Sequence, residues 1–133
     1  MLFPYKDDNP RILVPYVTYV IISINVLIFV FQLNMGMVSS AAEREFIYRF
    51  GFIPANFSII TVFTSMFLHG GISHIMGNMW FLWVFGDNVE GVLGHVKFAV
   101  FYIICGLAAT MSQLFVDPSS TIPMVGASGA IAG

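Results

Sequence analysis

The stretch from Val14 to Leu33, VPYVTYVIISINVLIFVFQL, decides the fold class of this chain. It lies inside a longer run, Ile12 to Ala42, that contains no Asp, Glu, Lys or Arg. A helix needs about 20 mostly apolar residues to cross the roughly 30 Å hydrocarbon core of a bilayer. The stretch therefore predicts a membrane-spanning helix at about 14–33, and with it an all-α membrane protein.

The composition of the whole chain agrees with a membrane protein. Of its 133 residues, 58% are hydrophobic, 16% are aromatic and only 9% are charged, and the mean hydropathy is +0.87. A soluble domain usually carries about 25% charged residues. The hydrophobicity excludes a disordered chain, and the net charge of −2 excludes the basic surface that binds nucleic acid. Cys105 is the single cysteine, so no intrachain disulfide can form.

Two further charge-free stretches follow, Phe50–Gly86 and Phe98–Val116. The second has the length of one span, whereas the first is too long for one helix and contains Pro54. We read its first part, to Gly71, as a surface or half-immersed segment that precedes a helix. The chain is accordingly divided into a leader (1–11), a first span (about 14–33), a first loop (34–71), a second span (about 72–92), a third span (about 96–115), a loop (117–125) and the start of a fourth span (126–133).

The small-residue run 126–133 is too short to cross a bilayer. We therefore expect the chain to be the amino-terminal piece of a longer protein, the alternative being a small three-span protein. Positive charges are more numerous on the cytoplasmic side of a membrane protein. Three of them (Lys6, Arg11 and Lys97) fall on the side of the amino terminus and two (Arg44 and Arg49) on the other, which predicts a cytoplasmic amino terminus.

Polar side chains inside apolar segments are costly, so each is a candidate functional residue. His74 and Asn78 are spaced i, i+4 and would share one face of a helix. Such a pair could donate hydrogen bonds to a developing negative charge, or it could be a buried pair that serves packing. A metal or haem site is disfavoured, because His69 and His74 would point about 140° apart on a helix and no carboxylate or cysteine accompanies them.

A second candidate is Ser128 in the run Gly126-Ala127-Ser128-Gly129. Glycines allow the sharp turn that exposes a nucleophilic hydroxyl at a helix start. The alternative is close helix packing, because Gly129 and Gly133 form a G-x-x-x-G pattern. For Glu90, expected at the end of the second span, a structural role is favoured over a catalytic one.

Taken in order, these motifs resemble those of the rhomboid family of intramembrane serine proteases. The matching residues, which extend over essentially all of this chain, are His69-Gly70-Gly71, His74-x-x-x-Asn78-Met79, Gly86-x-x-x-Glu90-x-x-x-Gly94 and Gly126-Ala127-Ser128-Gly129-Ala130, together with Asp7-Asp8-Asn9-Pro10 and Ile24-Asn25-Val26.

The resemblance implies a six-helix membrane core, here truncated to three full transmembrane helices and the start of a fourth. It implies that a Ser–His dyad cleaves transmembrane protein substrates without a cofactor or metal. Ser128 would be the nucleophile, His74 and Asn78 would stabilise the oxyanion, and His69 and Glu90 would be structural, as would Gly126 and Gly129. The resemblance also implies a multi-pass protein that is located in the bacterial cytoplasmic membrane.

Two departures from the family pattern are visible. Ile60-Thr61 stands about where the first loop often carries a Trp-Arg pair. The family's general base, a histidine on the sixth helix, matches none of the histidines present, so we expect this chain by itself to be inactive. The alternatives are a non-catalytic rhomboid relative that binds membrane clients, and a small three-span scaffold or transporter subunit.

Overall fold

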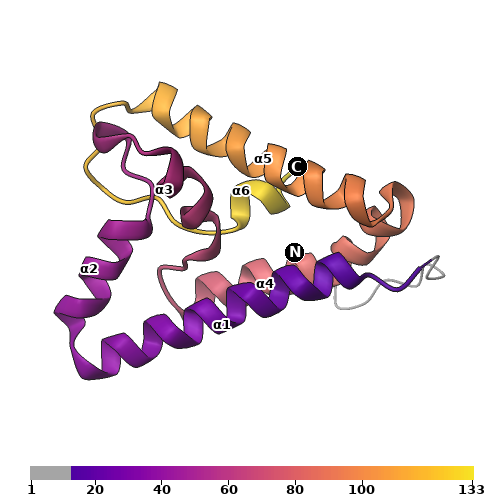
Figure 1. The fold of residues 1–133 in the computed structure, drawn as a ribbon, viewed down its shortest axis with the longest axis horizontal. Helices are drawn as coiled ribbons and strands as arrows, with labels where there is room; N and C mark the ends of the chain where they lie inside the picture. The colour runs from indigo at the N-terminus through magenta and orange to yellow at the C-terminus, as the bar shows by residue number, and fades with distance from the viewer. Residues whose placement is uncertain (1–12) are drawn as a thin grey trace, which may run out of the picture.

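The computed structural model describes residues 13–133, so the predicted leader, with Lys6 and Arg11, lies outside the described residues. Three long helices dominate: α1 (Tyr16–Val38), α4 (Ile72–Leu93) and α5 (His95–Val116). Figure 1 shows α1 and α4 side by side, with α5 across from them and the short α6 (Ser128–Ile131) between. The fold is a helical bundle, as the sequence predicts.

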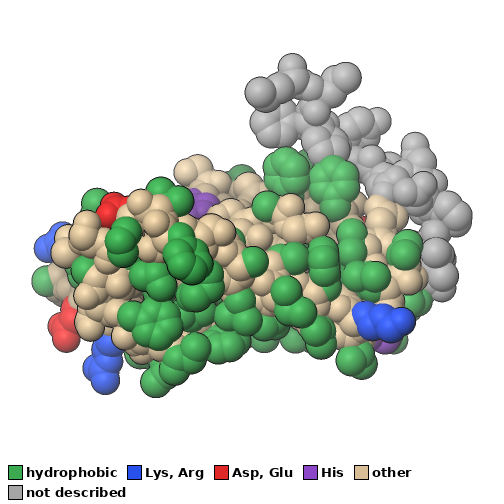
Figure 2. Space-filling view, turned by 90° about the horizontal axis from the view of Figure 1, so that it is seen from above, with side chains coloured by type: hydrophobic (Ala, Val, Ile, Leu, Met, Phe, Trp, Pro, Cys, Tyr) green, Lys and Arg blue, Asp and Glu red, His purple; other side chains and the backbone are tan. Residues whose placement is uncertain are grey.

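Length and composition allow α1 and α5 each to cross a membrane. A third span is possible if α4 is taken together with the helical segment Ile59–Phe67 that precedes it, although the two meet at an 85° bend. On the face shown in Figure 2, charged side chains lie toward the two ends of the molecule, more of them at one end, and the band between them holds hydrophobic and other uncharged groups. This distribution is what a bilayer requires of a protein that crosses it.

The segment between α1 and α4 is more helical than the expected loop. It contains α2 (Ser40–Phe50), a 3-10 turn η1 (Pro54–Asn56), α3 (Ile59–Thr64) and a second 3-10 turn η2 (Ser65–Phe67). Helix α1 also extends to Val38, and Ser39 then caps α2 by accepting a hydrogen bond from the Ala42 N–H at 3.3 Å. A serine at this position satisfies an amide that the helix leaves unpaired.

The loop before α6 is held against this helical segment. Phe52 and Met124 exchange two backbone hydrogen bonds of 3.0 and 2.7 Å, and the Gly126 N–H donates to the Ser65 carbonyl at 2.9 Å. Ala127 and Ala130 join a buried cluster with Ile21, Met66, Leu82, Phe98 and Tyr102. These contacts fix where α6 begins.

Glu90 connects the beginning of α1 to the end of α4. Its carboxylate is fully buried and accepts hydrogen bonds from the Val17 N–H at 2.9 Å, the Thr18 N–H at 2.8 Å and the Thr18 hydroxyl at 2.7 Å. His95 Nδ1 lies 2.5 Å from Oε1, the same carboxylate oxygen that accepts from the Val17 N–H. The first amides of a helix have no partner within the helix and carry partial positive charge, so a carboxylate is well suited to cap them.

We expect Glu90→Gln to lower the free energy of unfolding by at least about 2 kcal/mol, because an amide in place of the carboxylate leaves a buried N–H of α1 without an acceptor. The measurement is the midpoint of unfolding by SDS in mixed micelles, followed by helical circular dichroism. Glu45→Gln, the same substitution on the exposed surface of α2, is the matched control. Equal midpoints for the two variants would contradict the capping role of Glu90.

Candidate active site

The site is built around the first turns of α4. His74 and Asn78 lie one turn apart, near the helix start at Ile72. The amide nitrogen of Asn78 is 3.0 Å from Nε2 of His69, which precedes the helix. With the amide donating, Nε2 is the acceptor, so a neutral His69 carries its proton on Nδ1. The rings of His69 and His74 pack edge to face, with their centroids 5.1 Å apart.

His69 is itself fixed by a side chain of α1. Gln32 is completely buried, and its amide nitrogen donates to the His69 carbonyl at 3.0 Å while its amide oxygen accepts from the His69 N–H at 3.1 Å. One side chain therefore satisfies both backbone groups of a residue between two helices. In an apolar surrounding, unpaired groups of this kind would cost several kcal/mol, on the order of the transfer cost of a bare peptide group.

Gly126 brings the loop before α6 against this pair. A Cβ at position 126 would lie 2.7 Å from two ring atoms of His74 and 3.6 Å from the Asn78 amide nitrogen. The residue also has φ +125°, a conformation that favours glycine. Both the close approach and the backbone angle favour glycine at this position.

Ser128 follows two residues later as the first residue of α6. It is exposed, and among the described residues no hydrogen bond occupies its hydroxyl. It also lines a cavity of about 120 Å³ together with Gly126, Gly129, Ser65 and Thr110. Gly129 packs closely against α5, since a Cβ there would lie 2.4 Å from Cβ of Ala109.

Glu90 lies elsewhere. Twelve helical positions separate it from Asn78, or about 18 Å at 1.5 Å per residue, and its partners are Val17, Thr18 and His95. His95 belongs to this distant cluster. The structure thus brings His69, His74, Asn78 and Gly126 together, with Ser128 two residues after Gly126 along the chain, and separates them from Glu90.

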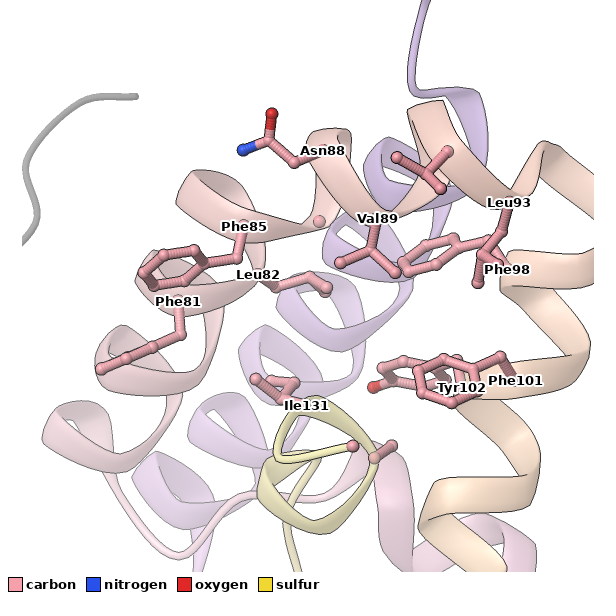
Figure 3. Close-up of a pocket in the computed structure, with 14 residues that line it drawn as sticks. Phe81, Leu82, Phe85, Asn88, Val89, Leu93, Phe98, Phe101, Tyr102 and Ile131 are labelled. Carbon is pink, nitrogen blue, oxygen red and sulfur yellow. The ribbon is translucent and has the colours of Figure 1, made fainter. Parts of the chain in front are cut away.

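A larger apolar groove of about 510 Å³ lies beside α6, between α4 and α5 (Figure 3). Phe81 and Phe85 project from α4, Phe101 and Tyr102 from α5, and Ile131 from α6. Its walls carry no charged side chain, so the groove offers mainly apolar contact.

Two residues that hold the predicted structural residues in place were not singled out from the sequence. They are Gln32, which binds the backbone of His69, and Thr18, which binds Glu90. Both are buried polar residues of α1, at 0% and 1% exposure. The signal that could have found them is the cost of a polar side chain within an apolar span, the same argument that drew attention to His74 and Asn78.

The sequence model of the Rhomboid domain matches residues 56–133 of this chain. The chain belongs to the rhomboid family. The matched region begins in the first loop and includes the site residues from His69 to Ser128.

The chain is also similar in sequence to individual rhomboid proteins. The chain is 29% identical to rhomboid protease GluP of Bacillus subtilis over 120 residues, which are 90% of this chain and 23% of that protein. It is 38% identical to RHOMBOID-like protein 6, mitochondrial, of Arabidopsis thaliana over 71 residues, or 53% of this chain and 22% of that protein. It is 30% identical to putative rhomboid protein L523 of Acanthamoeba polyphaga mimivirus over 121 residues, 89% of this chain and 60% of that protein.

The rhomboid chain thus spans less than a quarter of the length of the first two relatives. No solved structure gives a significant match to it. The relatives come from bacteria, plants and a virus, so the family match carries no indication of the source organism.

We expect Gly126→Ala to destabilise this rhomboid chain by about 1–3 kcal/mol, because the new methyl group meets the His74 ring and the backbone angle is unfavourable for alanine. Thermal unfolding in micelles measures the effect. Gly77→Ala is the control: Gly77 lies within α4, a Cβ there has no atom within 4 Å, and alanine favours helix. A Gly126→Ala variant as stable as Gly77→Ala would mean that the loop does not need to approach His74.

Proposed function

We propose that this chain carries the nucleophile and the oxyanion-binding side chains of an intramembrane serine protease. The observation that carries the proposal is the approach of Gly126 to His74 and Asn78, with the unbonded hydroxyl of Ser128 two residues away. An oxygen that becomes negative near Ser128 would lie close to two side chains able to donate hydrogen bonds. Family membership and the name of the relative GluP, a rhomboid protease, support the same proposal.

In the proposed reaction, the Ser128 hydroxyl attacks a substrate peptide carbonyl, and a histidine base takes its proton. The tetrahedral oxyanion accepts hydrogen bonds from His74, from the Asn78 amide and from the Ser128 backbone N–H. When the intermediate collapses, the peptide nitrogen takes the proton and leaves. Water then hydrolyses the acyl-serine by the same steps.

The base is proposed to lie outside these 133 residues. His69 accepts a hydrogen bond from Asn78, and His95 pairs with Glu90 at the other end of α4. His74 is assigned to the oxyanion. A serine without a base is a poor nucleophile at neutral pH, so we propose that residues 1–133 alone are inactive.

The apolar groove beside α6 fits the same proposal. Relatives several times longer than this chain have further segments available. The groove between α4 and α5 is large and uncharged, and the four-residue helix α6 forms one of its walls. We assign it to the packing of further membrane helices, with transmembrane proteins as the substrates and the amino terminus on the cytoplasmic side.

We expect Ser128→Ala to abolish cleavage of a fluorescent transmembrane substrate in proteoliposomes by the protein encoded by the complete reading frame. Asn78→Ala should lower the rate on the order of 10²–10³-fold, the usual effect of losing one oxyanion donor. Ser112→Ala on the exposed side of α5 and Asn34→Ala on α1 are the matched controls and should retain the parent rate.

If the Ser128→Ala variant cleaved at the parent rate, Ser128 would not be the nucleophile. Cleavage by residues 1–133 alone would place the base within them. A complete protein that retains its fold but cleaves none of a panel of membrane substrates, with or without Ser128, would favour the non-catalytic client-binding alternative.

A further inference from the structure

A second apolar groove lies between α1, α2 and the segment of α3 and η2. Its volume is about 330 Å³. Its lining is aliphatic and aromatic except for one threonine: Leu27, Ile28 and Phe31 of α1, Phe46 and Phe50 of α2, Thr64 of α3, Phe67 of η2, and Leu68. The Thr64 hydroxyl donates to the Phe50 carbonyl at 2.6 Å, so this polar group is satisfied within the wall.

The groove is open to the surroundings of the helix bundle. Leu27 is 69% exposed and Phe31 is 54% exposed, so the α1 side of the groove is not covered by the described chain. Water molecules in this groove would be poorly stabilised, because no polar atom of its lining is free to form a hydrogen bond with them. The surroundings of α1 in a membrane protein are lipid chains, which can fill an apolar groove without leaving any polar group unpaired.

A cation stands at one edge of the groove. Arg49 precedes Phe50 on α2, and its guanidinium carbon lies 5.7 Å from the centre of the Phe50 ring, which lines the groove. Among residues 13–133, no carboxylate pairs with Arg49. Glu43 of the same helix lies against Gly36 instead, close to where a Cβ of that residue would be. A guanidinium without a partner is well suited to bind a phosphate through two N–H donors.

The positions of this cation and the groove match the dimensions of a lipid. Helix α2 lies at one end of the molecule, where charged side chains gather (Figures 1 and 2). Leu27 lies 11 residues before the end of α1 at Val38, or about 16 Å along the helix, close to half of the roughly 30 Å hydrocarbon core. An acyl chain anchored at the level of α2 would therefore extend along the groove toward the middle of the bilayer.

We propose that this groove is a binding site for one phospholipid, with an acyl chain along Phe31, Phe46 and Phe67 and its phosphate on Arg49. A concave wall on three sides and a cation over the Phe50 ring distinguish this site from the convex surface of the bundle, where lipids exchange freely. The lipid would cover the contact between the first loop and α1. The proposal does not depend on proteolysis by Ser128.

The test is native mass spectrometry of the chain reconstituted in vesicles of phosphatidylcholine with one fifth phosphatidylglycerol and then extracted into mild detergent. We expect one phosphatidylglycerol to remain bound per chain. Arg49→Gln should lower the bound fraction at least 5-fold. Arg44→Gln should leave it unchanged, because residue 44 lies five positions away and projects about 140° around α2 from residue 49.

A second pair of variants tests the groove itself. Leu27→Trp places a larger side chain at the open wall and should lower the bound fraction, whereas Ile24→Trp, also exposed on α1 but outside the groove, should not. Circular dichroism verifies that every variant is folded. The proposal is overturned if no lipid is retained, if Arg44→Gln acts like Arg49→Gln, or if Leu27→Trp has no effect. It is also overturned if a second copy of the chain is retained in place of lipid.

Discussion

The capping of α1 by Glu90 is the constraint on which the rest of the bundle depends. A helix that begins in or near lipid cannot leave its first amides to water, so each of them needs a partner from the protein. Here Tyr16 donates to the Val14 carbonyl, Val17 and Thr18 donate to Glu90, and Tyr19 donates to the Pro15 carbonyl. Two of these four partners are oxygens of one side chain from α4, so the start of α1 is complete only when α4 lies beside it.

Close packing is the steric counterpart of this electrostatic arrangement. A Cβ on Gly86 would lie 2.9 Å from Thr18, which means that α1 and α4 pack tightly one helical turn from Glu90. At the other end of the pair, Gln32 satisfies both backbone groups of His69. Helix α1 is therefore joined to α4 and to the residues just before it by buried polar contacts at both ends. Lipid gives little hydrophobic drive for helix association, so such contacts and small residues determine the pairing.

The sequence was sufficient for the class of fold because charge-free apolar stretches of spanning length are typical of membrane helices and rare in soluble domains. It was less informative between α1 and α4. The stretch from Phe50 to Gly71 is uncharged and apolar, and its pattern did not reveal α3 or the two 3-10 turns. At the end of α1, Ser39 donates its N–H to the Met35 carbonyl and accepts from the first turn of α2, so one residue ends one helix and begins the next. The spacing of His74 and Asn78 indicated a shared helix face, but the involvement of Gln32 could not follow from it. That contact joins residues 37 positions apart, and only the folded chain brings them together.

The two halves of the candidate site are held by different kinds of interaction. His74 and Asn78 stand on a long helix that buried polar side chains join to α1, so their positions are linked to the stability of the whole bundle. Ser128 stands on a four-residue helix that is located by backbone hydrogen bonds from Phe52, Met124 and Gly126, and by the close approach of Gly129 to α5. Side-chain substitutions cannot remove those backbone bonds, but an added methyl group at either glycine displaces the turn. The serine half of the site is therefore sensitive above all to side-chain size at its two glycines, whereas the α4 half depends on buried polar side chains as well as on the close packing at Gly86.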